Sequence, residues 1–207
     1  MAKKTNPKIF RIGISEKSSS NWFATNKQMS DYIHQDRKIR DVISKQAKAA
    51  GIDKIVISRS STNIYVDLYV GRPGIAIGKG GSGIEALEKA IEKTVKVKAK
   101  ISVHEVKQPY LSSALVAGAI VEAMQKRIPP KVVMKQQIEK IEASGAKGAR
   151  IEIAGIGPVK QARTERAEMR GGKIPLTTLR AKIDYASSHV LTDKIYGIKV
   201  WIYKGEN

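Results

Sequence analysis

The chain has 207 residues, enough for two domains that each bury an ordinary apolar core. It carries 38 Lys and Arg against 19 Asp and Glu, and a formal net charge of +19 favours a polyanionic partner, of which RNA is the commonest in cells. The absence of cysteine excludes disulfides and thiolate metal sites and fits a reducing, cytoplasmic compartment. The longest uncharged stretch, 108–121, is too short and too polar to span a bilayer, so we expect no membrane partner.

The first elements predict an N-terminal extension at 1–36 and a small domain at 37–107. Ile39, Ile43 and Ala47 recur at helical spacing, with Asp36 as the expected N-cap and Gly51 as a stop. Two strands follow: a short β-branched run at 55–57, and a run at 64–70 in which apolar and polar residues alternate. This pattern indicates a sheet with one buried face.

The next segment is a glycine-rich turn at Gly78–Gly81, with the sequence Gly-Lys-Gly-Gly after the apolar residue Ile77. A turn without side chains lets backbone N–H groups approach a sugar-phosphate chain closely, and its lysine adds positive charge. Ser82 and Glu85 predict a capping box, so a helix should start after the turn and point its N-terminus at a phosphate. A further strand is expected at 100–104.

Two nucleotide-binding motifs compete with this interpretation of the turn. Residues Gly78–Gly83 match the dinucleotide fingerprint, which also requires an acidic residue about twenty positions later, but that region carries lysines. A Walker phosphate loop needs Ser or Thr after its lysine, whereas Gly80 follows Lys79. The order helix, strand, strand, Gly-x-x-Gly, helix, strand is typical of a type II KH domain, with helices on a three-stranded sheet.

The second half predicts an α/β domain at 108–207, with helices packed on a mostly antiparallel sheet. An apolar helix face at 115–124 is ended by Pro129 and Pro130, where proline can begin the next helix but cannot continue the last. The next helix should run to Gly145, and strands are expected at 150–154, 181–185 and 198–203. The fold class of the whole chain is therefore α+β.

Basic residues gather in the segment 160–182, where they outnumber Glu165 and Glu168. Bunched cations of this kind favour contact with phosphates over a merely solvated surface. The candidates are Lys160, Arg163, Arg166, Arg170, Lys173, Arg180 and Lys182.

Residues that would carry catalysis or hold a metal are scattered in the sequence. His34, His104 and His189 lie far apart, and the sequence has no nucleophile elbow and no carboxylate cluster outside ordinary helix faces. We therefore expect no catalytic residue, no metal, no cofactor and no small-molecule substrate.

Aromatic side chains are candidates for stacking on unpaired bases. Trp22 and Trp201 offer such faces, as do Tyr65 and Tyr69. Because they lie on a predicted strand, we expect the two tyrosines to cover a face of the sheet instead.

Six segments spread over nearly the whole chain carry a family resemblance: 4–13, 22–24, 72–81, 162–165, 175–185 and 196–202. In these segments the chain resembles the bacterial family of the third protein of the small ribosomal subunit. The resemblance implies a structural protein that binds rRNA in the head of the subunit, in the cytoplasm, with a type II KH domain and a second α/β domain. The RNA-binding residues that we expect are Lys4, Asn6, Arg11, Arg72, Gly78, Lys79, Gly80, Gly81, Lys160, Arg163, Arg166, Arg170, Lys173 and Arg180.

The resemblance also implies a role beside the messenger RNA. Members of the family sit near ribosomal proteins ten and fourteen, and with proteins four and five they line the channel through which mRNA enters. The family usually carries Arg-Arg-x-x-Lys on the second helix of the C-terminal domain, and the matching residues here are Lys131, Val132 and Lys135. Lys131 and Lys135 are four apart and can point the same way, but Val132 removes the middle charge, which predicts weaker unwinding of mRNA.

Two other functions compete with this one. An enzyme with a nucleotide cofactor would need the acidic ribose partner and a catalytic group, and the sequence offers neither. A free-standing KH regulator would bind short single-stranded RNA on its own, whereas a ribosomal protein depends on folded rRNA.

Overall fold

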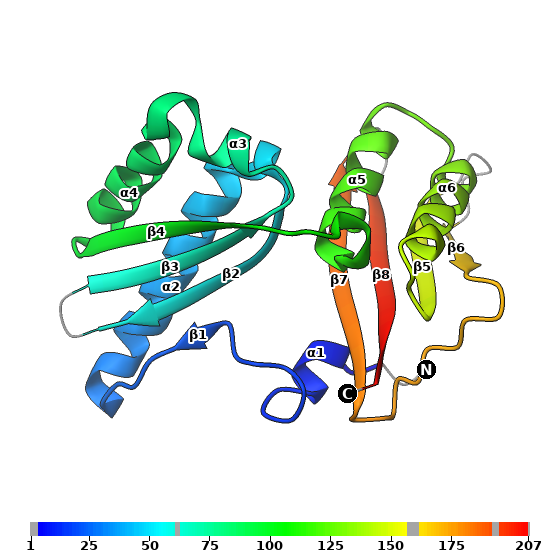
Figure 1. The fold of residues 1–207 in the computed structure, drawn as a ribbon, viewed down its shortest axis with the longest axis horizontal. Coiled ribbons are helices and arrows are strands. Elements are labelled where there is room, and N and C mark those ends of the chain that lie inside the picture. Colours follow the sequence, from blue (N-terminus) through cyan, green and yellow to red (C-terminus); the bar gives the residue numbers. More distant parts are fainter. Residues whose placement is uncertain (1–3, 61–62, 157–161, 192–194, 207) are drawn as a thin grey trace. The chain divides into compact units, whose positions relative to one another are not determined.

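The computed structural model describes residues 4–60, 63–156, 162–191 and 195–206. It divides the chain into two compact units: one comprises 18–107, and the other joins 1–17 to 108–207 (Figure 1). The expected boundary at 36/37 falls inside helix α2 (Asn26–Gln46), so the N-terminal extension is not a separate part. Its first 17 residues belong to the C-terminal unit, and the rest belongs to the unit at 18–107.

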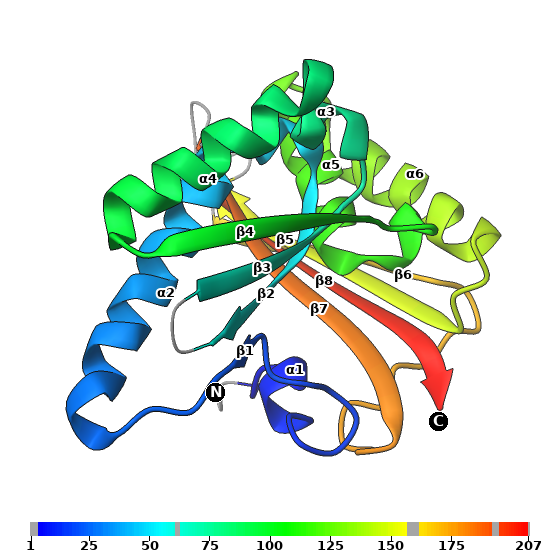
Figure 2. The same cartoon turned by 60° about the vertical axis from the view of Figure 1, so that its left-hand side comes forward.

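The unit at 18–107 contains a four-stranded sheet with the order β1-β2-β3-β4 (Figure 2). Its strands are β1 (Ser20–Asn21), β2 (Ile52–Arg59), β3 (Asn63–Val70) and β4 (Lys98–Glu105). Strands β2 and β3 are antiparallel, whereas β1 with β2 and β3 with β4 are parallel pairs. The three predicted strands are confirmed, and the two-residue β1 extends the sheet by one strand.

Helices of this unit pack on one face of its sheet. They are α2, the short α3 (Pro73–Ile77) and α4 (Ser82–Val95), with 3-10 turns η1 (Lys48–Ala50) and η2 (Lys79–Gly81). The order α2, β2, β3, Gly-x-x-Gly, α4, β4 is the KH order expected from the sequence. Fully buried residues from both layers meet in one core: Ile39, Ile43, Ile57, Leu68 and Ile91.

Helix α2 begins at Asn26, ten residues before the expected N-cap Asp36. Asp36 is instead a buried residue within the helix. The Asp36 carboxylate accepts hydrogen bonds from Ser20 Oγ and from the indole N–H of Trp22, both at 2.9 Å. It also forms an ion pair with Arg59 at 2.6 Å. Trp22 is therefore a structural residue here, and its ring meets Tyr32 edge-on.

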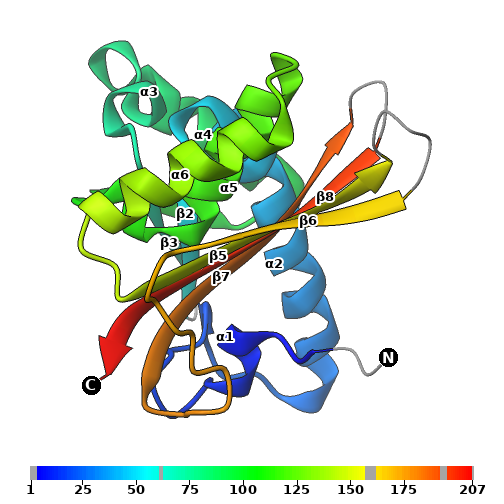
Figure 3. The same ribbon diagram turned by 90° about the vertical axis from the view of Figure 1, so that its right-hand side faces the viewer.

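The other unit has a four-stranded antiparallel sheet with the order β6-β5-β8-β7 (Figure 3). Its strands are β5 (Gly148–Ile156), β6 (Ala162–Glu168), β7 (Ala181–Leu191) and β8 (Ile195–Glu206). The helices are α1 (Pro7–Phe10), α5 (Ser113–Gln125) and α6 (Pro130–Ala143), with the turn η3 (Pro109–Leu111). Pro130 is the first residue of α6, as predicted.

The two faces of this sheet are covered differently. Helices α5 and α6 bury one face in a core that includes Ile120, Ile141, Ile151 and Val200, all at most 1% exposed. On the opposite face Trp201 packs with Ile183 and with residues of the segment that precedes β7, including Ile174 and Leu176. Strand β6 was not predicted, because its sequence Ala-Arg-Thr-Glu-Arg-Ala-Glu lacks large apolar residues.

Candidate RNA-binding surfaces

The Gly-x-x-Gly turn connects α3 to α4 and is built from left-handed glycines. The φ angles of Gly78, Gly80 and Gly81 are +71°, +62° and +88°, a region that other residues rarely adopt. Lys79 and Gly80 are exposed at the tip of the turn. The turn therefore presents backbone and one cation to solvent, as contact with a sugar-phosphate chain requires.

The start of α4 differs from the expected capping box. The N-cap is Gly81, and Ser82 is already the first residue of the helix. The helix approaches α3 so closely that a Cβ atom on Gly83 would lie 2.5 Å from the carbonyl oxygen of Ala76. This approach leaves the first turn of α4 beside the loop, where its N–H groups can accompany Lys79 in holding an anion. Arg72, the residue before α3, is also exposed.

The N-terminal segment places its three predicted RNA-binding residues in different roles. Lys4 is exposed, whereas the side chain of Asn6 accepts the backbone N–H of Lys8 at 3.0 Å and caps α1. Arg11 is fully buried: its guanidinium donates to the carbonyl oxygens of Pro7, Pro175, Leu176 and Thr178 at 2.8–3.3 Å. Burial lowers the pKa of Arg11, and Glu16 opposes that shift. The structure thus places Arg11 in a structural role rather than at an RNA surface.

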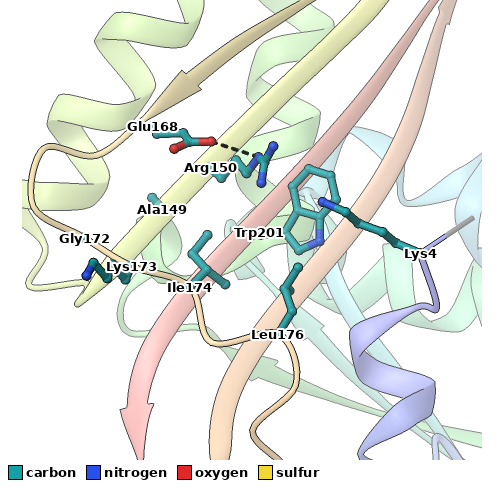
Figure 4. Close-up of a pocket in the computed structure, with 9 residues that line it drawn as sticks. All are labelled: Lys4, Ala149, Arg150, Glu168, Gly172, Lys173, Ile174, Leu176 and Trp201. Carbon is teal, nitrogen blue, oxygen red and sulfur yellow. Dashed lines mark ion pairs between the residues drawn. The ribbon is translucent and has the colours of Figure 1, made fainter. Parts of the chain in front are cut away.

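Lys4 and Lys173, which are far apart in sequence, line one pocket on the sheet face opposite α5 and α6 (Figure 4). The pocket has a volume of about 350 Å³, and Trp201 of β8 and Arg150 of β5 form part of its wall. Arg150 forms ion pairs with Glu152 at 2.8 Å and with Glu168 at 3.2 Å. Arg150 is not among the residues predicted from the sequence, although alternation along β5 places it on the face opposite the buried Ile151.

The predicted basic run is divided by strand β6. Alternation places Arg163 on the side of the sheet that faces α6 and Arg166 on the opposite side, where it pairs with Glu152 at 3.1 Å. Arg170, Lys173 and Arg180 follow in the connection to β7 and are exposed. Lys160 lies outside the described residues. The run is therefore not one continuous patch.

Lys131 and Arg163 share a second hollow, of about 630 Å³, between α6 and β6. The structure thereby joins a residue expected at the mRNA channel to one expected to bind rRNA. Lys135 is exposed one turn further along α6, and Val132 between them is 46% exposed. This surface combines two point charges with an apolar side chain.

The described part of the chain has neither a cluster of metal ligands nor a membrane-spanning helix. Within it, no group of three His, Cys, Asp or Glu side chains is placed to hold a metal ion. Among the same residues, no helix is long and apolar enough to cross a membrane.

The fold and the exposed loop define a KH-domain protein with a second α/β domain. The family model described as KH domain matches residues 38–111, and the model described as Ribosomal protein S3, C-terminal domain, matches residues 120–202.

Full-length relatives identify the family more closely. Proteins named small ribosomal subunit protein uS3 from Pseudoalteromonas translucida and Carboxydothermus hydrogenoformans are 40% and 43% identical to this chain. The matches cover 100% of this chain and 88% and 93% of those proteins. A relative of the same name from Coxiella burnetii is 39% identical, over 100% of this chain and 91% of its own length. The chain belongs to the small ribosomal subunit protein uS3 family, and these relatives are named as ribosomal proteins, not as enzymes.

Proposed function

We propose that this chain is a structural protein of the small ribosomal subunit that binds rRNA in the subunit head and works in the cytoplasm, as part of the ribosome. One observation carries the proposal: the exposed Gly78–Gly81 loop lies in a chain that relatives named as small-subunit proteins match over its full length. The net charge of +19 supports it, because a protein surrounded by RNA phosphates is relieved of its own repulsion.

The proposal assigns different contacts to the two units. In the unit at 18–107, the loop and Arg72 approach the rRNA backbone. In the other unit, Lys4, Arg163, Arg170, Lys173 and Arg180 contact phosphates, while Asn6 and Arg11 hold the N-terminal segment in place for them. The neighbours in the subunit are ribosomal proteins ten and fourteen.

We also propose that Lys131 and Lys135 lie beside incoming mRNA, in a channel shared with ribosomal proteins four and five. Both lysines are exposed on α6, and Lys131 faces the same hollow as Arg163. An ammonium group holds a phosphate as a point charge, without the forked geometry of arginine, so the grip on mRNA is electrostatic and modest.

Sedimentation tests the proposal directly. An epitope-tagged chain expressed in a bacterium should run with small subunits and whole ribosomes on a sucrose gradient, and it should stay with the small subunit when low magnesium separates the two subunits. A free-standing KH regulator would remain near the top of the gradient, bound to short RNA. That distribution would reject the ribosomal role.

The binding of purified chain to rRNA gives a second measurement. Each phosphate neutralised contributes about −0.7 to the slope of log affinity against log salt for single strands, so several contacts should give a slope of several units. A flat salt dependence would contradict phosphate binding by these lysines and arginines.

A further inference from the structure

The pocket that contains Lys4 and Lys173 combines an apolar wall with a cationic rim. Ile174, Leu176 and the 7% of Trp201 that is exposed supply the wall, and Figure 4 shows Lys4 reaching toward Trp201 from the N-terminal segment. The volume of about 350 Å³ lies within the range of about 300–1,000 Å³ typical of small-ligand sites. A site of this kind suits a flat apolar group that is attached to a negative charge.

The walls of this pocket are held in place from behind. Trp201 packs against Tyr185, with ring centroids 5.3 Å apart. Arg11 restrains the opposite wall, because its guanidinium donates to the carbonyl oxygens of Pro175 and Leu176 at 3.3 and 3.0 Å. A binding site that is formed before its ligand arrives avoids the ordering cost of binding.

We propose that this pocket takes one unstacked nucleobase of RNA, with the flanking phosphates on Lys4 and Lys173. The inference rests on the proposed function and specifies the ligand at one of its surfaces. Bases in single-stranded RNA can be splayed out and held against aromatic side chains or guanidinium planes. Arg150 and Glu168, at the pocket wall, offer a donor and an acceptor to the edge of the base.

Charge favours RNA over the other occupant of similar shape, an apolar side chain of a neighbouring protein. The described lining carries three cationic residues, Lys4, Arg150 and Lys173, against the single carboxylate of Glu168. Glu152 and Glu168 pair with Arg150, so the two lysines are the cations that a phosphate would meet first. An apolar side chain would leave these rim charges uncompensated.

The first experiment compares two labelled RNA strands of about eight nucleotides, matched in length and phosphate charge, one of which has abasic sites. The full chain should bind the abasic strand about 5- to 160-fold more weakly, because stacking on a protein aromatic contributes about 1–3 kcal/mol per base. Ile174→Gln should remove an apolar residue of the wall without changing the charge of the pocket, so this variant should discriminate less between the two strands. Fluorescence anisotropy measures the affinities, and circular dichroism confirms the fold of the variant.

A second measurement does not depend on altering the wall of the pocket. The chain has two tryptophans, so Trp22→Phe leaves Trp201 as the sole indole emitter. The strand with bases should quench Trp201 emission, and the abasic strand should not. Replacing Lys4 and Lys173 by Gln should weaken binding of both strands and flatten the salt slope, whereas Lys126→Gln, at the exposed end of α5, should change affinity little.

Equal affinity for the two strands, together with unchanged Trp201 emission, would overturn the inference and leave a protein side chain as the occupant to test. The gradient experiment keeps this result separate from the proposed function. If the chain sediments with small subunits but does not discriminate the strands, only the pocket inference fails. If the chain also stays at the top of the gradient, both fail.

Discussion

The amino group of Lys8 lies 2.6 Å from the carboxylate of Asp184, and this ion pair joins α1 to β7. Lys204 lies 3.7 Å from the same carboxylate, and the backbone N–H of Ser113 donates to it at 2.9 Å. Burial alone would raise the pKa of Asp184, but the two lysines and the hydrogen bonds outweigh it and hold the pKa below its ordinary value.

We expect Asp184→Asn to lower the free energy of unfolding by about 1–3 kcal/mol at neutral pH. Because the folded pKa is lowered, this stabilisation is present above the ordinary carboxyl pKa of about 3.9 and is lost as the pH falls through the lowered value. The gap between the unfolding free energies of wild type and variant should therefore close at acid pH, as urea titrations at several pH values would show. Asp41→Asn, at the exposed pair with Arg37, is the control and should show little gap at any pH. A gap for Asp184→Asn that is independent of pH would contradict the account.

Two glycine replacements should have opposite effects on stability. Gly83→Ala places a Cβ atom 2.5 Å from a backbone carbonyl, so we expect a loss of about 1–3 kcal/mol as α3 and α4 are forced apart. Gly118→Ala, within α5, meets open space and should stabilise its unit by about 0.5–1 kcal/mol. Chemical denaturation of the two variants measures both effects, and equal destabilisation would show that close helix contact is not the reason for Gly83.

The charge of the Gly-x-x-Gly loop can be reversed without loss of the fold. Lys79→Asp with Gly80→Asp should repel phosphates, while aspartate tolerates the left-handed backbone of an exposed Gly80 at a cost of about 1 kcal/mol. We expect rRNA affinity to fall about tenfold or more and circular dichroism to stay native. Ser44→Asp with Lys45→Asp, on the exposed face of α2, is a control with the same change in charge. An affinity loss no larger than that of the control would make the loop purely structural.

Lys131→Ala with Lys135→Ala should slow translation through a stable mRNA hairpin and leave unstructured mRNA nearly unaffected. Two exposed point charges predict a modest effect, about two- to fivefold. Paired reporters with and without the hairpin, translated by ribosomes that carry the variant, measure the ratio. Lys126→Ala with Lys140→Ala removes the same charge from other exposed positions of this unit. If the hairpin reporter responds to neither pair, Lys131 and Lys135 do not act on mRNA.

Arg11→Lys distinguishes the structural role of Arg11 from a role in RNA binding. Lysine keeps the charge, but its single nitrogen cannot donate both to Pro7, as Nη1 of Arg11 does, and to Leu176 and Thr178, as Nη2 does, so we expect a loss of about 2–4 kcal/mol in stability. Thermal unfolding measures this loss. A variant that unfolds like wild type but binds RNA less tightly would restore Arg11 to the RNA surface.

Periodicity predicted most of the fold, because apolar residues set the buried faces. The strand predicted from the alternation at 64–70 and the helix predicted from the apolar face at 115–124 each contribute residues to one of the two cores. The Gly-x-x-Gly turn was also readable, since positive φ angles require glycine. In each of these segments, a local rule coincides with the tertiary environment.

The parts that the sequence did not predict depend on distant partners. Asp36 fits the sequence pattern of an N-cap, because its partners Arg59 and Trp22 are recognisable only in the folded chain. As a polar residue, Asp36 also interrupts the apolar periodicity from which the full length of helix α2 would be predicted. Arg11 was predicted to bind RNA because the sequence does not show that the carbonyl oxygens of 175–178 surround it in the folded chain. Strand β6 lies at an edge of its sheet, where charged residues suit exposure and conceal the strand pattern.

The hydrogen bond from Arg11 to Thr178 spans 167 residues, so during synthesis it cannot form until Thr178 has been added to the chain. The unit at 18–107 has its whole sequence available before the partners of the N-terminal segment exist. At about 5–20 residues per second, the segment waits on the order of 10–30 s for the strand and loop that bury Arg11. During that interval Ile9, Phe10, Ile12 and Ile14, which stay 45–64% exposed even in the folded chain, form an apolar segment at the N-terminal end of the growing chain. A chaperone that binds short apolar stretches near a cationic residue would have this segment available throughout that interval.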